Sequence, residues 1–85
     1  MNVMYFSADW CVPCKSFKPI VEQVSQDLGV AINYINVDYD ASLTQQYSIT
    51  SVPTILVTNN RGEVVHRKTG VMSREHLIQL FNKLN

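Results

Sequence analysis

The segment Trp10-Cys11-Val12-Pro13-Cys14 contains both cysteines of this 85-residue chain and gives the first indication of its fold. A bridge across so short a loop is not the staple that stabilises small secreted domains. Thiol-disulfide exchange needs one thiolate that attacks a substrate disulfide and a second thiol that resolves the mixed disulfide. Two cysteines at this spacing supply both, so the pair is interpreted as a reaction centre.

A helix is predicted to begin at this dithiol. Pro13 suits the first helical turn, where a backbone N–H would have no partner anyway. The N-terminus of the helix favours a thiolate at Cys11, which is the expected nucleophile, and Cys14 is the expected resolving thiol one turn further in. Apolar side chains then recur at intervals of three and four residues until Gly29: Phe17, Ile20, Val21, Val24 and Leu28.

The rest of the chain alternates between strand and helix patterns. Strands are predicted over residues 3–7, 30–38, 54–58 and 63–69, and further helices over 40–47 and from Ser73 onward. The first connection suits a parallel crossover, and the turn at residues 59–62 makes the last two strands antiparallel. The prediction is a single α/β domain over residues 1–85, in the order β-α-β-α-β-β-α, with a four-stranded mixed sheet flanked by three helices.

Composition narrows the classes of function. Apolar residues make up 46% of the chain and charged residues 16%, as in globular domains. Seven basic and seven acidic residues cancel, so neither nucleic acid nor a membrane surface is an expected partner. The first six residues lack the features of a signal peptide, and no apolar run reaches the roughly 20 residues that span a bilayer. A cytoplasmic monomer is expected.

Two segments carry a resemblance to a known family. Ala8-Asp9-Trp10-Cys11-Val12-Pro13-Cys14-Lys15 resembles the active-site segment of the thioredoxin family, and Ser51-Val52-Pro53-Thr54 resembles its cis-proline loop; Gly62 and Gly70 fit as well. The resemblance extends over nearly the whole chain from Val3, without the extra N-terminal strand and helix of full thioredoxin, so that the size approaches that of glutaredoxin. It implies a thioredoxin-like fold and a protein-disulfide reductase that needs no cofactor and no metal.

The same resemblance implies a substrate-binding site around the dithiol. Pro53 would be cis and would leave the backbone of Val52 free to pair with an extended substrate segment. An apolar contact surface would surround Cys11, made of Trp10, Val12, Val52, Gly70 and Val71. The implied partners are disulfide-containing protein substrates and an electron donor, which is a flavoenzyme of the thioredoxin-reductase type or glutathione.

Three positions depart from the family's pattern. Tyr5 occupies the strand position where thioredoxins carry a buried Asp that assists proton transfer at the resolving cysteine, and Tyr34 stands where a Lys usually pairs with that Asp. A phenol can still donate a hydrogen bond toward a sulfur. Val12 replaces the usual Gly. These departures concern the rate and pH dependence of the resolving step and the reduction potential, and leave the reaction class unchanged.

Three alternatives compete with the reductase. The dithiol with His66 and His76 has the ligand count of a zinc site, but the two histidines lack finger-like spacing. A glutaredoxin matches the chain length, but Thr69-Gly70-Val71-Met72-Ser73 lacks the paired glycines and Asp that usually form the glutathione site. The third alternative is a thioredoxin-like binding subunit in which the dithiol is incidental.

The residues that flank the dithiol have two interpretations each. Trp10 is either a core aromatic or a substrate contact, and its place directly before Cys11 favours the contact. Lys15 either supports a thiolate or is solvated, whereas Lys18 is expected to be solvated. Asp9 is expected to be an N-cap or a solvated loop residue and not a catalytic group.

Overall fold

The computed structural model describes residues 1–84 and has the predicted order of elements. The strands are β1 (Asn2–Ser7), β2 (Ile32–Asn36), β3 (Thr54–Thr58) and β4 (Val64–Thr69), and the helices are α1 (Val12–Leu28), α2 (Ala41–Gln46) and α3 (Arg74–Asn82). The four strands form one mixed sheet in the order β2-β1-β3-β4, in which only the β1–β2 pair is parallel. The predicted fold class is confirmed.

Strand β2 is shorter at both ends than the sequence pattern predicts. The backbone N–H of Val30 donates to the carbonyl of Ser25 at 2.8 Å and so completes the end of α1. At the other end the N–H of Val37 still donates to the carbonyl of Ser7 at 2.9 Å, but the N–H of Asp38 donates to Oδ1 of Asn36 at 2.9 Å and closes a turn. The N–H groups of Val30 and Asp38 are therefore not free to extend the strand ladder.

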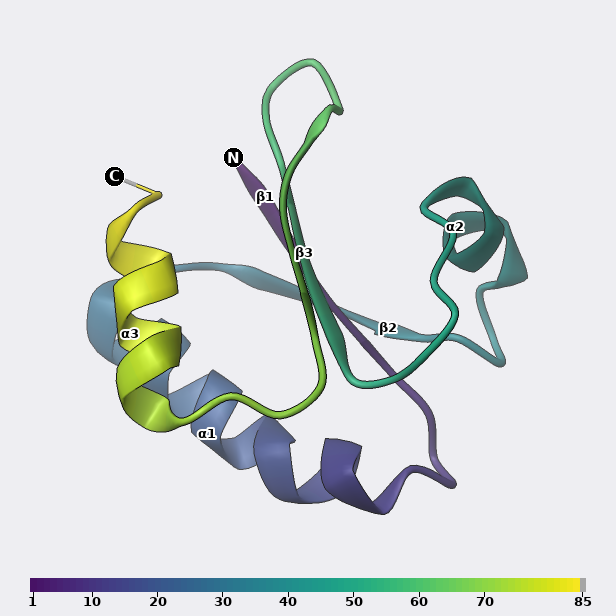
Figure 1. Cartoon of the computed structure of the whole chain (residues 1–85), viewed down its shortest axis with the longest axis horizontal. Helices are drawn as coiled ribbons and strands as arrows, with labels where there is room; N and C mark the ends of the chain where they lie inside the picture. Colours follow the sequence, from purple (N-terminus) through teal and green to yellow (C-terminus); the bar gives the residue numbers. More distant parts are fainter. Residues whose placement is uncertain (85) are drawn as a thin grey trace.

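Alternation along β1 divides the core into two layers. Val3 and Tyr5 point to the face covered by α1 and α3, where they pack with Phe17 and Phe81. Met4 and Phe6 point to the opposite face, which α2 covers, and pack with Leu56, Leu43 and Tyr47. Figure 1 shows this arrangement of two helices on one side of the sheet and one on the other.

One end of the sheet gathers the segments that matter for function. The loop after β1, the start of α1, the loop before β3 and the loop after β4 all lie at the lower end of the molecule in Figure 1. Helix α1 begins there because Cys11 keeps an extended backbone, with φ −90° and ψ 103°, and caps the helix. Within residues 1–84, no helix is long and apolar enough to cross a membrane.

Candidate active site

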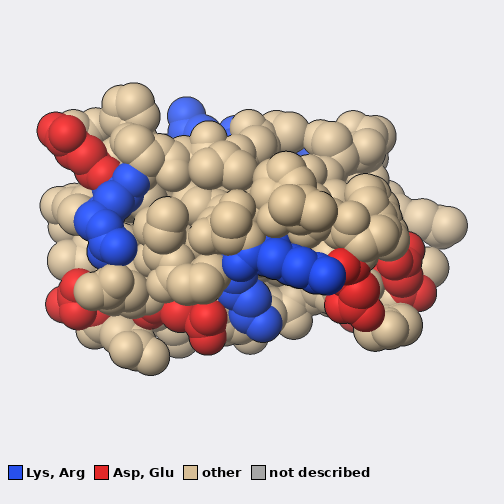
Figure 2. All heavy atoms as spheres, turned by 90° about the horizontal axis from the view of Figure 1, so that it is seen from below, with Lys and Arg blue, Asp and Glu red and all other residues tan. Residues whose placement is uncertain are grey.

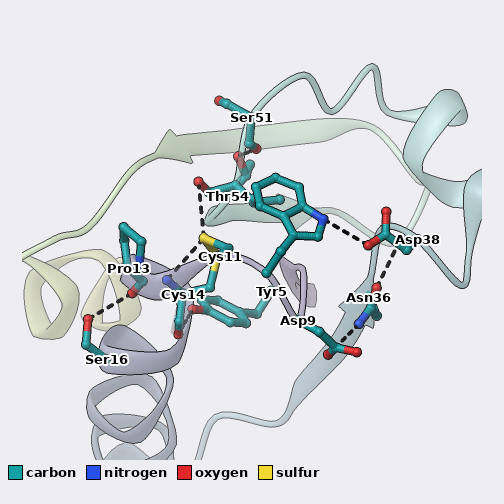
Figure 3. The surroundings of a disulfide bond; sticks show 12 residues. Tyr5, Asp9, Cys11, Pro13, Cys14, Ser16, Asn36, Asp38, Ser51 and Thr54 are labelled. Carbon is teal, nitrogen blue, oxygen red and sulfur yellow. Dashed lines mark hydrogen bonds between the residues drawn. A yellow bond between two sulfur atoms is a disulfide. The ribbon is translucent and has the colours of Figure 1, made fainter.

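Cys11 and Cys14 form a disulfide at the start of α1 (Figure 3). Their Cα atoms are 5.3 Å apart. The backbone N–H of Cys14 donates to Sγ of Cys11 at 3.2 Å, so a helix-terminal donor points at the sulfur that caps the helix. The two residues are 4% and 2% exposed, and exposure therefore does not distinguish their roles. Their hydrogen bonding differs: within residues 1–84 a backbone N–H is directed at the Cys11 sulfur and none at the Cys14 sulfur, and such a donor stabilises a thiolate.

The loop before β3 lies directly beside this sulfur. The Val52–Pro53 peptide bond is cis. The carbonyl oxygen of Val52 is 3.8 Å from Sγ of Cys11, within reach of a thiol donor when Cys11 is reduced. The N–H of Gly70 donates to the carbonyl of Pro53 at 2.8 Å and ties the loop after β4 to the cis-proline loop. Segments more than 40 residues apart in sequence thus meet at the dithiol.

The loop that precedes the dithiol is held by a polar network that the sequence reasoning missed. Trp10 Nε1 donates to Asp38 Oδ2 at 3.0 Å. Asp9 accepts hydrogen bonds from Asn36 Nδ2 and from the hydroxyl of Tyr39, each at 3.0 Å. Asn36 Oδ1 in turn accepts from the N–H of Asp38 at 2.9 Å (Figure 3). The only signal in the sequence is the density of polar side chains that follow β2, which does not specify their partners.

This network settles the placement of two residues. Asp9 is neither the N-cap of α1, which is Cys11, nor simply solvated, because both of its carboxylate oxygens accept a side-chain hydrogen bond. Trp10 is 68% exposed, which excludes a core position. Its ring forms one wall of a groove of about 110 Å³ with Val52 and Ile49.

The residues Trp10, Val12, Val52, Gly70 and Val71, which the sequence predicts to contact substrate, are called the docking face. Val12 and Val71 are 73% and 56% exposed, unusually high for apolar side chains, while Val52 and Gly70 are half-buried. All five belong to the segments gathered at one end of the sheet. Figure 2 views the molecule from that end and shows a broad uncharged area with charged side chains along its margins.

The comparisons with known proteins agree with this geometry. The thioredoxin family model matches residues 1–83. This chain belongs to the thioredoxin family. Thioredoxin of Bacillus subtilis is 36% identical over 80 residues, which cover 92% of this chain and 76% of the relative. A thioredoxin-like protein of Synechocystis is 42% identical over 76 residues, which cover 87% and 71%.

Solved thioredoxin structures share the fold. A mutant thioredoxin from Halobacterium salinarum superposes with a TM-score of 0.87 at 30% identity, covering 96% of this chain and 72% of that one. The germline-specific thioredoxin Deadhead of Drosophila melanogaster gives a TM-score of 0.88 at 26% identity, covering 99% and 80%. With its Cys11–Cys14 pair, this member of the thioredoxin family is a thiol-disulfide oxidoreductase that reduces protein disulfides, and this activity is favoured over the glutaredoxin and scaffold alternatives.

Tyr5, which the resemblance places at the position of a buried carboxylate in thioredoxins, does not direct its hydroxyl to a sulfur. It donates to the backbone carbonyl of Cys14 at 2.9 Å. Burial, with a smaller contribution from Tyr34, raises the pKa of Tyr5 to about 12, so the phenol stays protonated at neutral pH. Tyr5 therefore fixes the backbone of Cys14 and does not serve as a base.

Tyr34 faces Tyr5 but, unlike Tyr5, is not buried. It is 40% exposed, and its ring packs edge-on against Tyr5 with the ring centroids 5.8 Å apart. The ammonium of Lys18 lies 5.1 Å from the centroid of the Tyr34 ring, a cation–π contact that holds this lysine at the surface. The two phenols thus do not reproduce a buried ion pair.

A second hollow, of about 120 Å³, reaches Cys14 from the side of β1. It is lined by Ser7, Ala8, Asp9, Cys14, Lys15 and Lys18, so one acidic and two basic residues lie around the hollow beside Cys14. The two histidines lie elsewhere, His66 on β4 and His76 on α3. Within residues 1–84, no three metal-ligating side chains converge, so the dithiol lacks the further ligands of a zinc site.

Proposed function

We propose that Cys11 is the attacking sulfur and Cys14 the resolving sulfur in the reduction of protein disulfides. The Cys11 thiolate attacks one sulfur of the substrate disulfide, forms a mixed disulfide and releases the other substrate sulfur as a thiolate. The Cys14 thiolate then attacks Sγ of Cys11 and displaces the second substrate thiolate. The substrate gains two electrons, and the protein is left with the Cys11–Cys14 disulfide.

The hydrogen bond from the Cys14 N–H to Cys11 Sγ carries this assignment. At 3.2 Å it offers the Cys11 thiolate a charge-assisted hydrogen bond at the positive end of a 17-residue helix. Pro13 supports the same geometry, because a proline within the first turn leaves no additional unpaired N–H at the helix start. No corresponding donor is directed at the Cys14 sulfur within residues 1–84.

The docking face would bind the substrate around this sulfur. The Val52 carbonyl beside Cys11 and the cis bond to Pro53 favour pairing of the loop backbone with an extended substrate segment. The exposed Trp10, Val12 and Val71 would cover apolar substrate side chains next to the cystine. Gly70, held against Pro53, leaves this approach free of a side chain.

A flavoenzyme of the thioredoxin-reductase type is the proposed electron donor, with glutathione as the alternative. Residues 69–73 contain a single glycine and no carboxylate with which to bind the charged ends of glutathione. The proposal also has the protein act as a single-domain monomer, residues 1–85, in the cytoplasm, where thiols are kept reduced. Disulfide exchange between two sulfur pairs requires no cofactor or metal in this protein.

Insulin-disulfide reduction tests the proposal. With NADPH and a thioredoxin reductase, the wild-type protein should reduce insulin, and Cys11→Ser should abolish the reaction. Cys14→Ser should instead accumulate a mixed disulfide through Cys11, detectable as a covalent adduct by mass spectrometry. Adducts through Cys14 in the Cys11→Ser variant would reverse the assignment of the two sulfurs. Faster turnover with glutathione and glutathione reductase would favour the glutaredoxin-type donor.

A further inference from the structure

A groove between β4 and α3 lies beside the docking face and has no role in the reaction described so far. Its volume is about 410 Å³, compared with about 110 Å³ for the groove beside Trp10. The buried side chain of Leu80 and the half-buried Met72 give it an apolar base. Lys68 lies on the β4 side and His76 and Lys83 on the α3 side.

The groove is continuous with the site of the reaction. Val71 belongs to the docking face and also lines the groove. The preceding residue, Gly70, is hydrogen-bonded to Pro53, and the neighbouring Val52 carbonyl lies 3.8 Å from Sγ of Cys11. A substrate segment that pairs with the cis-proline loop would therefore have its flanking residues next to the groove.

The charges of the groove all have one sign. Lys68 pairs with Ile55 across the β3–β4 ladder, so its side chain lies on the face that α3 covers. No Asp or Glu lines the groove, although acidic and basic residues balance over the whole chain. Within residues 1–84, the one ion pair joins Arg61 and Glu63, so Lys68 has no carboxylate partner there.

We propose that this groove binds an acidic segment of the substrate protein that flanks the cystine to be reduced. The inference rests on the proposed function and specifies its substrate class. Carboxylate side chains of the segment would lie near Lys68 and Lys83, and an apolar side chain would cover Leu80 and Met72. Because these lysines are exposed, the contribution is modest, depends on salt and acts on encounter with the substrate.

Two peptides of matched sequence test the specificity. Each carries one cysteine as a mixed disulfide with thionitrobenzoate, flanked on both sides by glutamates in one peptide and by glutamines in the other. Release of thionitrobenzoate by the reduced protein is followed by absorbance, and each rate constant is divided by that for dithiothreitol, which corrects for intrinsic reactivity. We expect a roughly three- to fivefold preference for the acidic peptide at low salt, the effect of one or two exposed charge pairs.

Charge-reversal variants test whether the two lysines cause the preference for the acidic peptide. Lys68→Glu with Lys83→Glu should abolish or invert it while leaving the rate on the glutamine peptide unchanged. Arg61→Glu, the same change of charge at the exposed β3–β4 turn, should keep it. Equal corrected rates for the two peptides with the wild-type protein would overturn the inference, and so would a preference that survives reversal of both lysines.

A binding measurement separates this inference from the proposed function. The acidic peptide without its cysteine is titrated into the oxidised wild-type protein, and backbone amide chemical shifts are followed by NMR. Shifts at Lys68, Val71 and His76 support the groove even if the chain fails to reduce any peptide. Shifts confined to other surfaces, or none at all, refute it even if the chain reduces both peptides well.

Discussion

The hydroxyl of Tyr5 donates a hydrogen bond to the backbone carbonyl of Cys14 over 2.9 Å and so links the central strand β1 to the resolving cysteine. Both residues are buried. The contact directs a neutral donor to the helix backbone, and the hollow beside Cys14 is lined by Asp9, Lys15 and Lys18. Tyr5 therefore contributes to the stability of the fold, whereas the charged side chains near Cys14 belong to other residues.

Tyr5→Phe should lower the stability of the protein more than its activity. The change removes a buried hydrogen bond and leaves the Cys14 carbonyl without that donor, so the free energy of unfolding should fall by about 1 kcal/mol. Urea denaturation of the oxidised protein measures this change. Tyr47→Phe is the matched control, because the Tyr47 hydroxyl makes no hydrogen bond within residues 1–84. A loss of insulin reduction larger than the loss of stability would assign Tyr5 a chemical role.

Alkaline pH should destabilise the folded protein through the same phenol. Burial raises the folded-state pKa of Tyr5 to about 12, whereas the unfolded value is near 10. The unfolded chain therefore loses this proton first, and the stability that Tyr5 contributes is complete below pH 10 and lost as the pH rises to about 12. Urea midpoints measured between these values should fall less steeply in Tyr5→Phe than in wild type; parallel curves would contradict the prediction.

Asn36→Ala should release Trp10 without altering the dithiol. The amide of Asn36 joins Asp9 to the N–H of Asp38, which holds the indole. Because Trp10 is the one tryptophan of the chain, its fluorescence anisotropy reports directly on this wall of the docking face. We expect lower anisotropy and a higher KM for insulin with little change in kcat. Unchanged anisotropy would show that the indole is held by packing alone.

Lys18→Gln should slow the resolving step at neutral pH. Lys18 lines the hollow beside Cys14, and a nearby positive charge favours a thiolate. Removing it should move the pH midpoint of thionitrobenzoate release from a Cys11 mixed disulfide to higher pH. Asp9→Asn, which removes a negative charge from the same hollow, should move the midpoint to lower pH. Shifts in one direction for both variants would rule out an electrostatic origin.

The prediction of β2 shows where reading the sequence locally fails. Residues 30–38 have strand composition throughout, yet the strand covers only Ile32–Asn36. The N–H groups on either side are used by the end of α1 and by the turn at Asn36, and these uses depend on where the neighbouring elements lie. The direction of the Tyr5 hydroxyl is similar: the residue type permits a bond to sulfur, but packing against Phe17 and Tyr34 aims it at a carbonyl.

The sequence by itself determined the order of elements, the mixed sheet and the placement of the dithiol at a helix N-terminus, because apolar periodicity, capping and turn chemistry act between residues that are close in the chain. Only the tertiary structure decided what surrounds the dithiol. The approach of Val52 to Cys11 joins residues 41 apart, and the bond from Trp10 to Asp38 joins residues 28 apart. Neither pairing is encoded by a local pattern, because each exists only once the sheet has brought the ends of separate strands to one edge.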